Sequence, residues 1–244
     1  MPDKFHPQTR SAPGGAHDAT RRALLDAGAD VFAEVGFHHA TVRDICRRAG
    51  ANVAAVNYHF GDKETLYAEV LAEQSRLAMA LHPLPAAGPD TTPAQRLEDF
   101  IRAFLQRVLS AELSARHGRM MAREMVEPTR ALDRLVAESI RPQSAALSVI
   151  LRDLVGPGPS EETLRLLGMS VVGQILFYCH CQPVLIRLFP GMPFNAERLD
   201  TLTLHITAFS LAAVRGLSQP PVAPARVPRR PKTPSPPAGR RRRS

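Results

Sequence analysis

TVRDICRRAGANVAAVNYHF, residues 41–60, is the stretch of sequence that decides the fold. Thr41 carries a hydroxyl that can cap the free N–H groups at the start of a helix. Apolar residues then follow at helical spacing, namely Val42, Ile45, Cys46 and Ala49. Gly50 comes where the chain must turn, and glycine tolerates the positive φ that helix C-termini often need. The stretch therefore predicts a short helix that ends in a tight turn.

A second short helix is expected directly after this turn, with Asn52 as its N-cap. Val53 and Val56 lie three residues apart and are expected to bury against Ile45, which completes a helix-turn-helix. The remaining side chains then face outward and suit a DNA major groove, where alanine can touch thymine methyls, asparagine can pair with adenine, and tyrosine and histidine can donate to phosphates or bases: Ala54, Ala55, Asn57, Tyr58 and His59. An ordinary helical hairpin would have the same spacing, so the pattern alone leaves that alternative open.

The flanking sequence extends this pattern, because residues 20–71 resemble the amino-terminal domain of TetR-type bacterial transcriptional repressors. The resemblance rests on spaced landmarks: Ala27, Phe32, Gly36, Thr41, Ile45, Ala49, Gly50, Tyr58, Phe60, Lys63, Leu66 and Tyr67. Cys46 departs from it, since alanine is usual there, but a buried thiol packs as a small hydrophobe.

The resemblance implies that residues 52–59 form the recognition helix and that Thr41 and Lys63 contact phosphates. Together with the outward side chains, it gives this set of expected DNA contacts: Thr41, Arg43, Asn52, Val53, Ala54, Ala55, Asn57, Tyr58, His59 and Lys63.

Composition fits a helical protein that works inside the cell. The chain has 244 residues, of which 44% are hydrophobic, with no tryptophan and no apolar run long enough to span a bilayer. The first residues, MPDKFHPQTRSAPGGAHD, lack the apolar stretch of a secretory signal. Three cysteines are too few for a disulfide framework. We therefore expect a cytoplasmic protein with no membrane partner.

The net charge of +8 carries little information about DNA binding, because most of it comes from the tail. Residues 219–244 hold eight basic and no acidic side chains, whereas residues 18–218 hold 21 basic and 22 acidic ones. The tail is rich in proline and arginine, so we expect it to be disordered and dispensable. The alternative is that it holds nearby phosphates and steepens the salt dependence of DNA binding.

Proline, glycine and the apolar spacing divide the chain into an all-α, two-domain fold. We expect a disordered arm (residues 1–17), a DNA-binding head (18–81), a break rich in proline (82–93), a helical body for effector binding and dimerisation (92–218) and the tail (219–244). Helices are expected at residues 18–35 with Gly36 as the stop, 63–81, 93–110, 115–126, 129–155 with a break at Pro142, 161–182 and 195–217. Residues 185–189 are expected to form a short apolar turn.

The last two long helices carry more apolar side chains than one small body needs to bury: Leu166, Val171, Ile175, Leu199, Leu202, Ile206, Phe209 and Ala213. The resemblance to TetR-type repressors implies that these helices pair with their copies in a four-helix bundle. We therefore expect a homodimer that places two recognition helices one DNA turn apart on an inverted-repeat operator, a double-stranded DNA partner.

Two further clusters lie in the expected body. In FYCHCQP, residues 177–183, thiols and an imidazole are adjacent, but consecutive helical side chains splay apart, so we expect neither a metal site nor a disulfide and no cofactor. MMAREMVEPT and GQILFYCHCQPVLIRL resemble the carboxy-terminal domain of the CecR-like subgroup. That resemblance implies an effector pocket lined by Arg119, Met120, Arg123, Phe177 and His180. Salt bridges over a methionine-filled core are the alternative.

These observations predict a ligand-responsive transcriptional regulator, with repression by a dimer that a small-molecule effector releases from DNA. The sequence contains no G-x-S-x-G, H-E-x-x-H or G-x-x-x-x-G-K-[ST] pattern, so we expect no enzyme. Two alternatives stay open. His117, Glu124, Cys179 and His180 could assemble a catalytic site, or the chain could be a helical adaptor or small-molecule-binding protein that does not recognise a DNA sequence.

Overall fold

The computed structural model describes residues 13–86, 88, 90–109, 111–191 and 196–217. Most of the predicted arm and the predicted tail lie outside these residues. Every regular element within them is helical, which confirms the predicted all-α fold. The elements are α1 (Pro13–His39), α2 (Val42–Ala49), α3 (Val53–Phe60), α4 (Lys63–Leu81), α5 (Pro93–Leu109), α6 (Ala111–Val126), α7 (Ala131–Leu135), η1 (Val136–Ile140), α8 (Arg141–Val155), α9 (Glu161–His180), α10 (Gln182–Leu188) and α11 (Ala196–Leu217).

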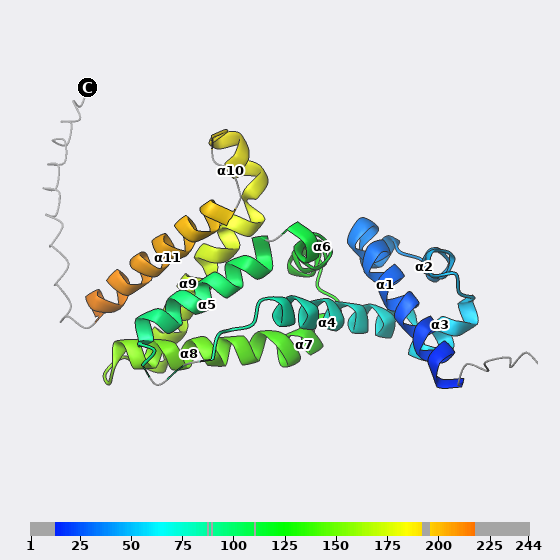
Figure 1. Cartoon of the computed structure of the whole chain (residues 1–244), viewed down its shortest axis with the longest axis horizontal. Helices are drawn as coiled ribbons and strands as arrows, with labels where there is room; N and C mark the ends of the chain where they lie inside the picture. The colour runs from blue at the N-terminus through cyan, green and yellow to red at the C-terminus, as the bar shows by residue number, and fades with distance from the viewer. Residues whose placement is uncertain (1–12, 87, 89, 110, 192–195, 218–244) are drawn as a thin grey trace, which may run out of the picture.

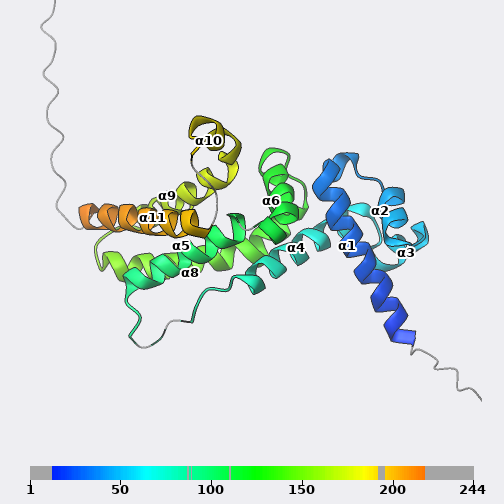
Figure 2. The same ribbon diagram turned by 45° about the horizontal axis from the view of Figure 1, so that its top comes forward.

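The molecule is elongated, with the head at one end and the body at the other (Figure 1). Helices α1, α2 and α3 form the head, and α4 leads from it into the body. Helices α5, α8, α9 and α11 pack on one another in the body, and α6 lies between them and α1. Helix α10 projects from the body in both ribbon views (Figure 2).

Local caps shape the helix-turn-helix as its sequence predicts. The Thr41 hydroxyl accepts from the Asp44 amide at 3.1 Å, and Gly50 closes α2 with φ 64°. Asn52 caps α3 by accepting from the Ala55 amide at 2.9 Å. Each cap satisfies an N–H group that would otherwise lack a partner, so the helix ends are set by the sequence.

One expected core contact is wrong. Val56 is fully buried with Ile45, but the Val53 side chain is 44% exposed. Val53 is the first residue of α3, and its side chain therefore points away from α2 at the open end of the turn.

The first helix is longer than predicted at both ends. It begins at Pro13, so residues 13–17 of the predicted arm are helical, and it continues past Gly36 to His39. Gly36 adopts φ 79° and ψ 172°, a region that is essentially restricted to glycine. It kinks α1 instead of ending it.

Two other segments also differ from expectation. The helix predicted over residues 129–155 is split into α7, η1 and α8, where η1 is a five-residue π-helix just before Pro142. Proline lacks an N–H and crowds the carbonyl one turn back, and the wider turn accommodates it. The expected apolar turn at residues 185–189 belongs largely to α10, which starts after a break at Cys181 with Pro183 in its first turn.

Buried apolar side chains form two clusters that do not follow the predicted domain boundary. One lies in the head, and it also includes Met120 of α6 with Ala131 and Leu135 of α7. The other joins α5, α8, α9 and α11. Helices α6 and α7 therefore pack with the head, although the sequence assigns them to the body.

Among the described residues, no single helix combines the length and the apolar composition needed to cross a bilayer, although α9 and α10 pass that test together as a pair bent by 69°.

We expect Gly36→Ala to lower the free energy of unfolding by about 1–3 kcal/mol, because alanine strains at this φ and ψ. Its added methyl would also meet the guanidinium of Arg123. Gly173→Ala is the matched control, since Gly173 lies inside α9 with open space where the alanine methyl would go. This variant should raise the free energy of unfolding by about 0.5–1 kcal/mol. Urea denaturation of both variants measures the difference, and an unchanged midpoint for Gly36→Ala would contradict the strain.

Candidate DNA interface and effector cavity

The outward face of α3 carries most of the side chains predicted to contact DNA. Asn52, Val53, Ala54, Asn57 and Tyr58 are exposed, and Tyr58 is the most open of the large apolar and aromatic side chains of the head at 75%. Such a face presents an amide, a phenol and small apolar groups to a major groove. These positions are compatible with DNA contact, and the contacts themselves stay predictions.

The other predicted α3 residues lie partly inside. Ala55 is half-buried against the head core. His59 is half-buried as well, and its ring stacks edge-on against His17 of α1, with the centroids 4.4 Å apart. Burial lowers the pKa of His59, and the neighbouring His17 and Arg21 lower it further. His59 therefore lies at the edge of the exposed α3 face.

At the start of α2, Arg43 is exposed, whereas Thr41 is engaged in its own cap. The Thr41 hydroxyl donates to an Asp44 carboxylate oxygen at 2.6 Å, which lowers the pKa of Asp44. A phosphate contact from Thr41 would have to replace that bond, whereas the exposed part of the long Arg43 side chain can extend toward a phosphate.

Lys63 holds the head together in this structure. Its ammonium donates to the carbonyl oxygens of Phe37 at 3.0 Å and Ala40 at 3.1 Å, and it lies 4.4 Å from the centroid of the Phe37 ring. These carbonyls follow the kink in α1, so Lys63 fixes the end of α1 against the start of α4. An ammonium has three donors, which leaves one for the predicted phosphate contact.

A buried carboxylate on α6 ties the body to the head. Glu124 is 1% exposed and accepts from the Tyr67 hydroxyl of α4 at 2.7 Å. It also accepts from the amide of Thr129 at 3.1 Å and from its hydroxyl at 3.0 Å. Burial raises the pKa of Tyr67, and the adjacent Glu124 carboxylate raises it further, so the phenol stays protonated as the donor.

Two arginines on α6 bind the first helix of the head. Arg123 donates to the Glu34 carbonyl at 3.0 Å, beside the kink at Gly36. Arg116 pairs with Asp30 at 2.7 Å. Together with the buried Met120, these contacts fasten one face of α6 to α1.

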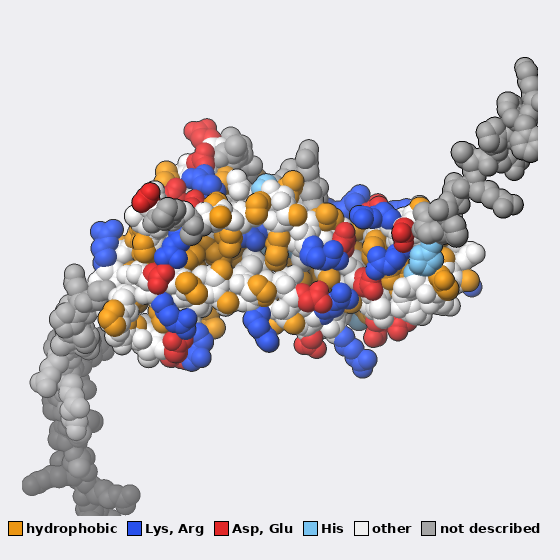
Figure 3. Space-filling view, turned by 60° about the horizontal axis from the view of Figure 1, so that its bottom comes forward, with side chains coloured by type: hydrophobic (Ala, Val, Ile, Leu, Met, Phe, Trp, Pro, Cys, Tyr) orange, Lys and Arg blue, Asp and Glu red, His pale blue; other side chains and the backbone are white. Residues whose placement is uncertain are grey.

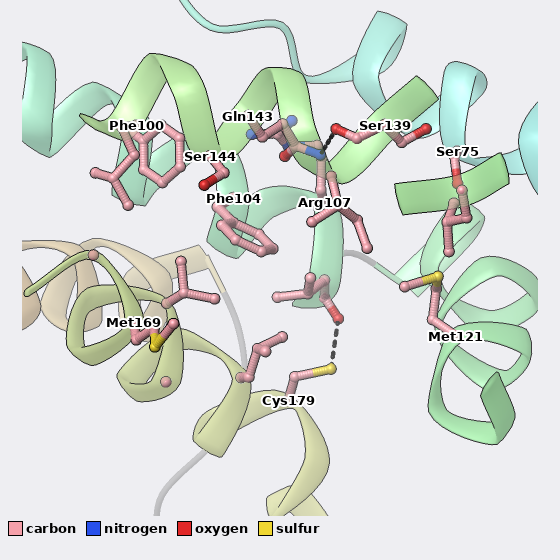
Figure 4. Close-up of a pocket in the computed structure, with 18 of the residues that line it drawn as sticks. Ser75, Phe100, Phe104, Arg107, Met121, Ser139, Gln143, Ser144, Met169 and Cys179 are labelled. Atoms are coloured by element: carbon pink, nitrogen blue, oxygen red, sulfur yellow. Dashed lines mark hydrogen bonds between the residues drawn. The ribbon is translucent and has the colours of Figure 1, made fainter. Parts of the chain in front are cut away.

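The opposite face of α6 lines a cavity of about 530 Å³ in the body. Its wall comes from α4, α5, α6, η1, α8 and α9, as the close-up shows (Figure 4). Most lining side chains are apolar, with Phe100 and Phe104 from α5 and Met121, Met125 and Met169 among them. A mostly apolar cavity of this size with a few polar groups is the usual form of a small-molecule site.

Of the five residues predicted to line an effector pocket, only His180 lines this cavity. Met120 is fully buried in the head core, and Arg123 binds the Glu34 carbonyl. Arg119 is exposed beside Glu34, and Phe177 is exposed on α9. Side chains one residue apart on a helix point about 100° apart, so these residues lie on the same helices as the lining residues but face other directions. Their role in effector binding stays a prediction.

The sequence reasoning missed the lining residues of α5 and η1–α8, including Phe104, Arg107, Ser139 and Gln143. The sequence did contain one indication that Arg107 faces the interior. Phe100, Phe104 and Arg107 recur at helical spacing, so an arginine continues an otherwise apolar stripe that should face the interior.

The residues proposed as an alternative catalytic site do not assemble. His117, Cys179 and His180 line the cavity, but Glu124 does not, and both of its oxygens are hydrogen-bonded. The three cysteines are free thiols, and the described residues contain no group of three side chains arranged to hold a metal ion.

Exposed apolar side chains lie on the two helices predicted to form a dimer. They are Leu166, Met169 and Phe177 of α9 and Leu204 and Phe209 of α11. In the space-filling view, hydrophobic side chains gather near the middle of the molecule, and acidic and basic ones are spread over both the body and the head (Figure 3). Four residues predicted for the dimer face pack instead inside the body: Val171, Ile175, Leu202 and Ile206.

Two known protein families match separate parts of the chain. Residues 24–70 match the family described as bacterial regulatory proteins, tetR family. Residues 93–214, half of the chain, match the C-terminal domain of the HTH-type transcriptional dual regulator CecR.

Similar proteins include regulators of known structure or name. The dual regulator CecR of Shigella flexneri is 25% identical over 211 residues, which cover 83% of this chain and 94% of that protein. The regulator BetI of Klebsiella pneumoniae (strain 342) is 32% identical over 136 residues, 51% of this chain and 70% of that protein. A candidate transcriptional regulator from Pseudomonas aeruginosa PAO1 has the same fold with a TM-score of 0.62 and 22% identity, over 86% of this chain and 97% of that one.

We expect stability to depend on pH through His117, which lines the cavity. Burial lowers the pKa of His117 from 6.5 to about 4. Between these values the unfolded chain binds a proton that the folded chain does not, so stability falls as the pH drops from 6.5 to 4. One pKa unit corresponds to 1.36 kcal/mol, which gives a loss on the order of 2–3 kcal/mol.

Chemical denaturation at several pH values tests this loss with two variants. His117→Gln should flatten the dependence of the free energy of unfolding on pH between pH 4 and 6.5. The control is His39→Gln, at an exposed position on α1, which should keep the wild-type slope. Equal slopes in all three proteins would contradict the assignment to His117.

Proposed function

The chain belongs to the TetR family of bacterial transcriptional regulators and carries a C-terminal domain of the CecR type, and we propose that it is a homodimeric repressor released from its operator by an effector in the cavity. Its general role follows from the family: it is a DNA-binding regulator of transcription. The operator symmetry, the dimer, the effector and the cytoplasmic location belong to the proposal.

The observation that carries the proposal is the two-sided packing of α6. One face holds the head through Arg116, Met120, Arg123 and Glu124, and the other face lines the cavity through His117, Gly118, Met121 and Met125. Met121 also packs against the head core from the cavity side. A ligand that moves the lining face must also move the head-binding face, because both belong to one short helix. Effector and operator then bind with a coupling free energy between them.

A second connection runs through α4, which leads from the head into the body. Helix α4 also contacts both parts, since Tyr67 binds Glu124 and Ser75 lines the cavity. Two helices therefore reach from the cavity to the head. The helix-turn-helix can shift as a unit because Lys63 and the caps hold it together.

The exposed apolar side chains of α9 and α11 support the dimer. A monomer that exposed Leu166, Phe177, Leu204 and Phe209 in water would leave these apolar side chains without a partner. A two-fold axis through this face would place the two heads on the same side of the dimer, as an inverted-repeat operator requires.

We expect two head variants to affect DNA binding differently. Asn57→Ala should weaken binding to the best operator by about 1–3 kcal/mol and relax the preference at one base pair, because a bidentate amide contact to a base is lost. Arg43→Ala should weaken binding to all sequences alike and reduce the slope against salt by about 1, because a phosphate contact is lost.

Selection of operators from random DNA, followed by fluorescence anisotropy at several salt concentrations, measures both effects. Wild-type protein that selects no sequence at about 150 mM salt, a concentration at which specific sites still bind tightly, would contradict the proposal. So would a uniform loss for Asn57→Ala with an unchanged preference.

We expect Phe209→Glu to produce a monomer, because it buries a charge at the proposed dimer face. Operator affinity should then fall by at least about tenfold, since each half-site must be bound separately. Val149→Glu on α8 is the control, because Val149 is 50% exposed and Phe209 is 58% exposed. Sedimentation velocity gives the mass, and a wild-type monomer that still binds the operator specifically would contradict the dimer.

A further inference from the structure

The cavity contains a buried arginine whose guanidinium carbon lies 5.5 Å from the centroid of the Phe104 ring. Arg107 of α5 is only 7% exposed and lines the cavity wall. Its Nε donates to the Ala103 carbonyl at 3.0 Å, whereas its Nη2 is buried without any hydrogen-bond partner. Among the described side chains no carboxylate pairs with it. Burial of an unpaired guanidinium is costly, so this arrangement needs a physical reason.

Two other polar atoms in the same wall are also buried and unpaired. They are Oγ of Ser75 on α4 and Nδ1 of His117 on α6. Buried polar groups in folded proteins nearly always have partners, and groups without them are often completed by a ligand. Three such atoms from three helices around one cavity therefore indicate a polar subsite that a bound molecule would complete.

The charge of the wall has one sign. Its ionisable lining residues are Arg107, Arg165, His117, His180 and Cys179, and no aspartate or glutamate lines the described part of the wall. Arg165 is exposed and already pairs with Glu162 at 2.7 Å. The unbalanced charge inside the cavity is therefore that of Arg107, and a cationic ligand would meet repulsion without a counter-charge.

We propose that the cavity binds an organic anion, with its acidic group on Arg107 and its apolar body along the phenylalanine and methionine side chains. The planar guanidinium matches the two oxygens of a carboxylate. The Ser75 hydroxyl and the His117 imidazole, from two other helices around the cavity, are further buried polar groups without a protein partner. That this anion is the effector rests on the proposed function, but its binding in the cavity does not.

The remaining wall fits the apolar body of such a molecule. Phe100 and Phe104 supply rigid rings, while Met121 and Met169 are flexible and adapt to ligands of different shape. Figure 4 shows Arg107 among these side chains, with Gln143 and Ser144 on the α8 side and Met169 and Cys179 on the α9 side. The apolar residues therefore select the apolar body of the ligand, and Arg107 selects its negative charge.

Pairs of probes that share one carbon skeleton but differ in charge measure the contribution of the charge to binding. Decanoate and naphthalene-2-carboxylate provide anions with a chain and a ring, and decanamide and 2-naphthamide provide the same bodies without charge. Isothermal titration calorimetry and thermal melting on the full-length protein measure binding below the micelle concentration of decanoate. We expect at least one acid to bind about tenfold or more tightly than its amide, because charge-assisted hydrogen bonds are the stronger ones.

Three variants then locate the charge. Arg107→Met keeps much of the length of the side chain. It should weaken binding of the acid by about tenfold or more, while the amide should bind as tightly as before or more tightly. Arg107→Lys should keep part of the preference for the acid. Arg165→Met is the matched control at the cavity edge and should bind as wild type does. Because Arg107→Met removes an unpaired buried charge, the empty variant should melt at or above the wild-type temperature.

The outcomes are distinct. The proposal fails if neither acid binds better than its amide, if Arg107→Met keeps the preference, or if Arg165→Met removes it. Operator binding is measured separately. Acids that bind through Arg107 without releasing operator would support this inference and refute the effector role, whereas an absence of operator binding would refute the proposed repressor and leave the anion site intact.

Discussion

The structure depends on the hydrogen bond between the Tyr67 hydroxyl and the Glu124 carboxylate, which joins the head to the body inside a shared core. Glu124 is buried and would be costly without its partners. Met120 enters the apolar core of the head one turn earlier on the same helix. Helix α6 therefore cannot move far without either breaking this bond or carrying the head with it.

This constraint explains how a ligand in the cavity can affect the DNA-binding head. A cavity elsewhere in the body could bind a ligand without any effect on α1, but this one shares α6 and α4 with the head. A ligand shifts an equilibrium only by its differential affinity for the two states, and the shared helices make such a difference unavoidable when the wall moves.

The sequence predicted the local features well, because single residues decide them. Thr41 and Asn52 cap their helices as expected, and Gly50 closes the turn. The lining of the cavity does not follow from the sequence, because Met120 and Met121 are adjacent and equally apolar. Only the packing of α6 buries Met120 fully in the head core and leaves Met121 at the cavity wall, where it also touches that core. The π-helix was not predicted either, because Pro142 indicates a break in the helix but does not specify the wider turn that accommodates it.

Hydrogen–deuterium exchange of the full-length protein, with and without operator DNA, tests the central claim most directly. If α6 and the head move as one unit, operator binding should slow exchange in α6 and in the second half of α1 as well as in α2 and α3. Protection limited to α2 and α3, with exchange in α6 unchanged, would contradict the coupling between the cavity and the DNA-binding head.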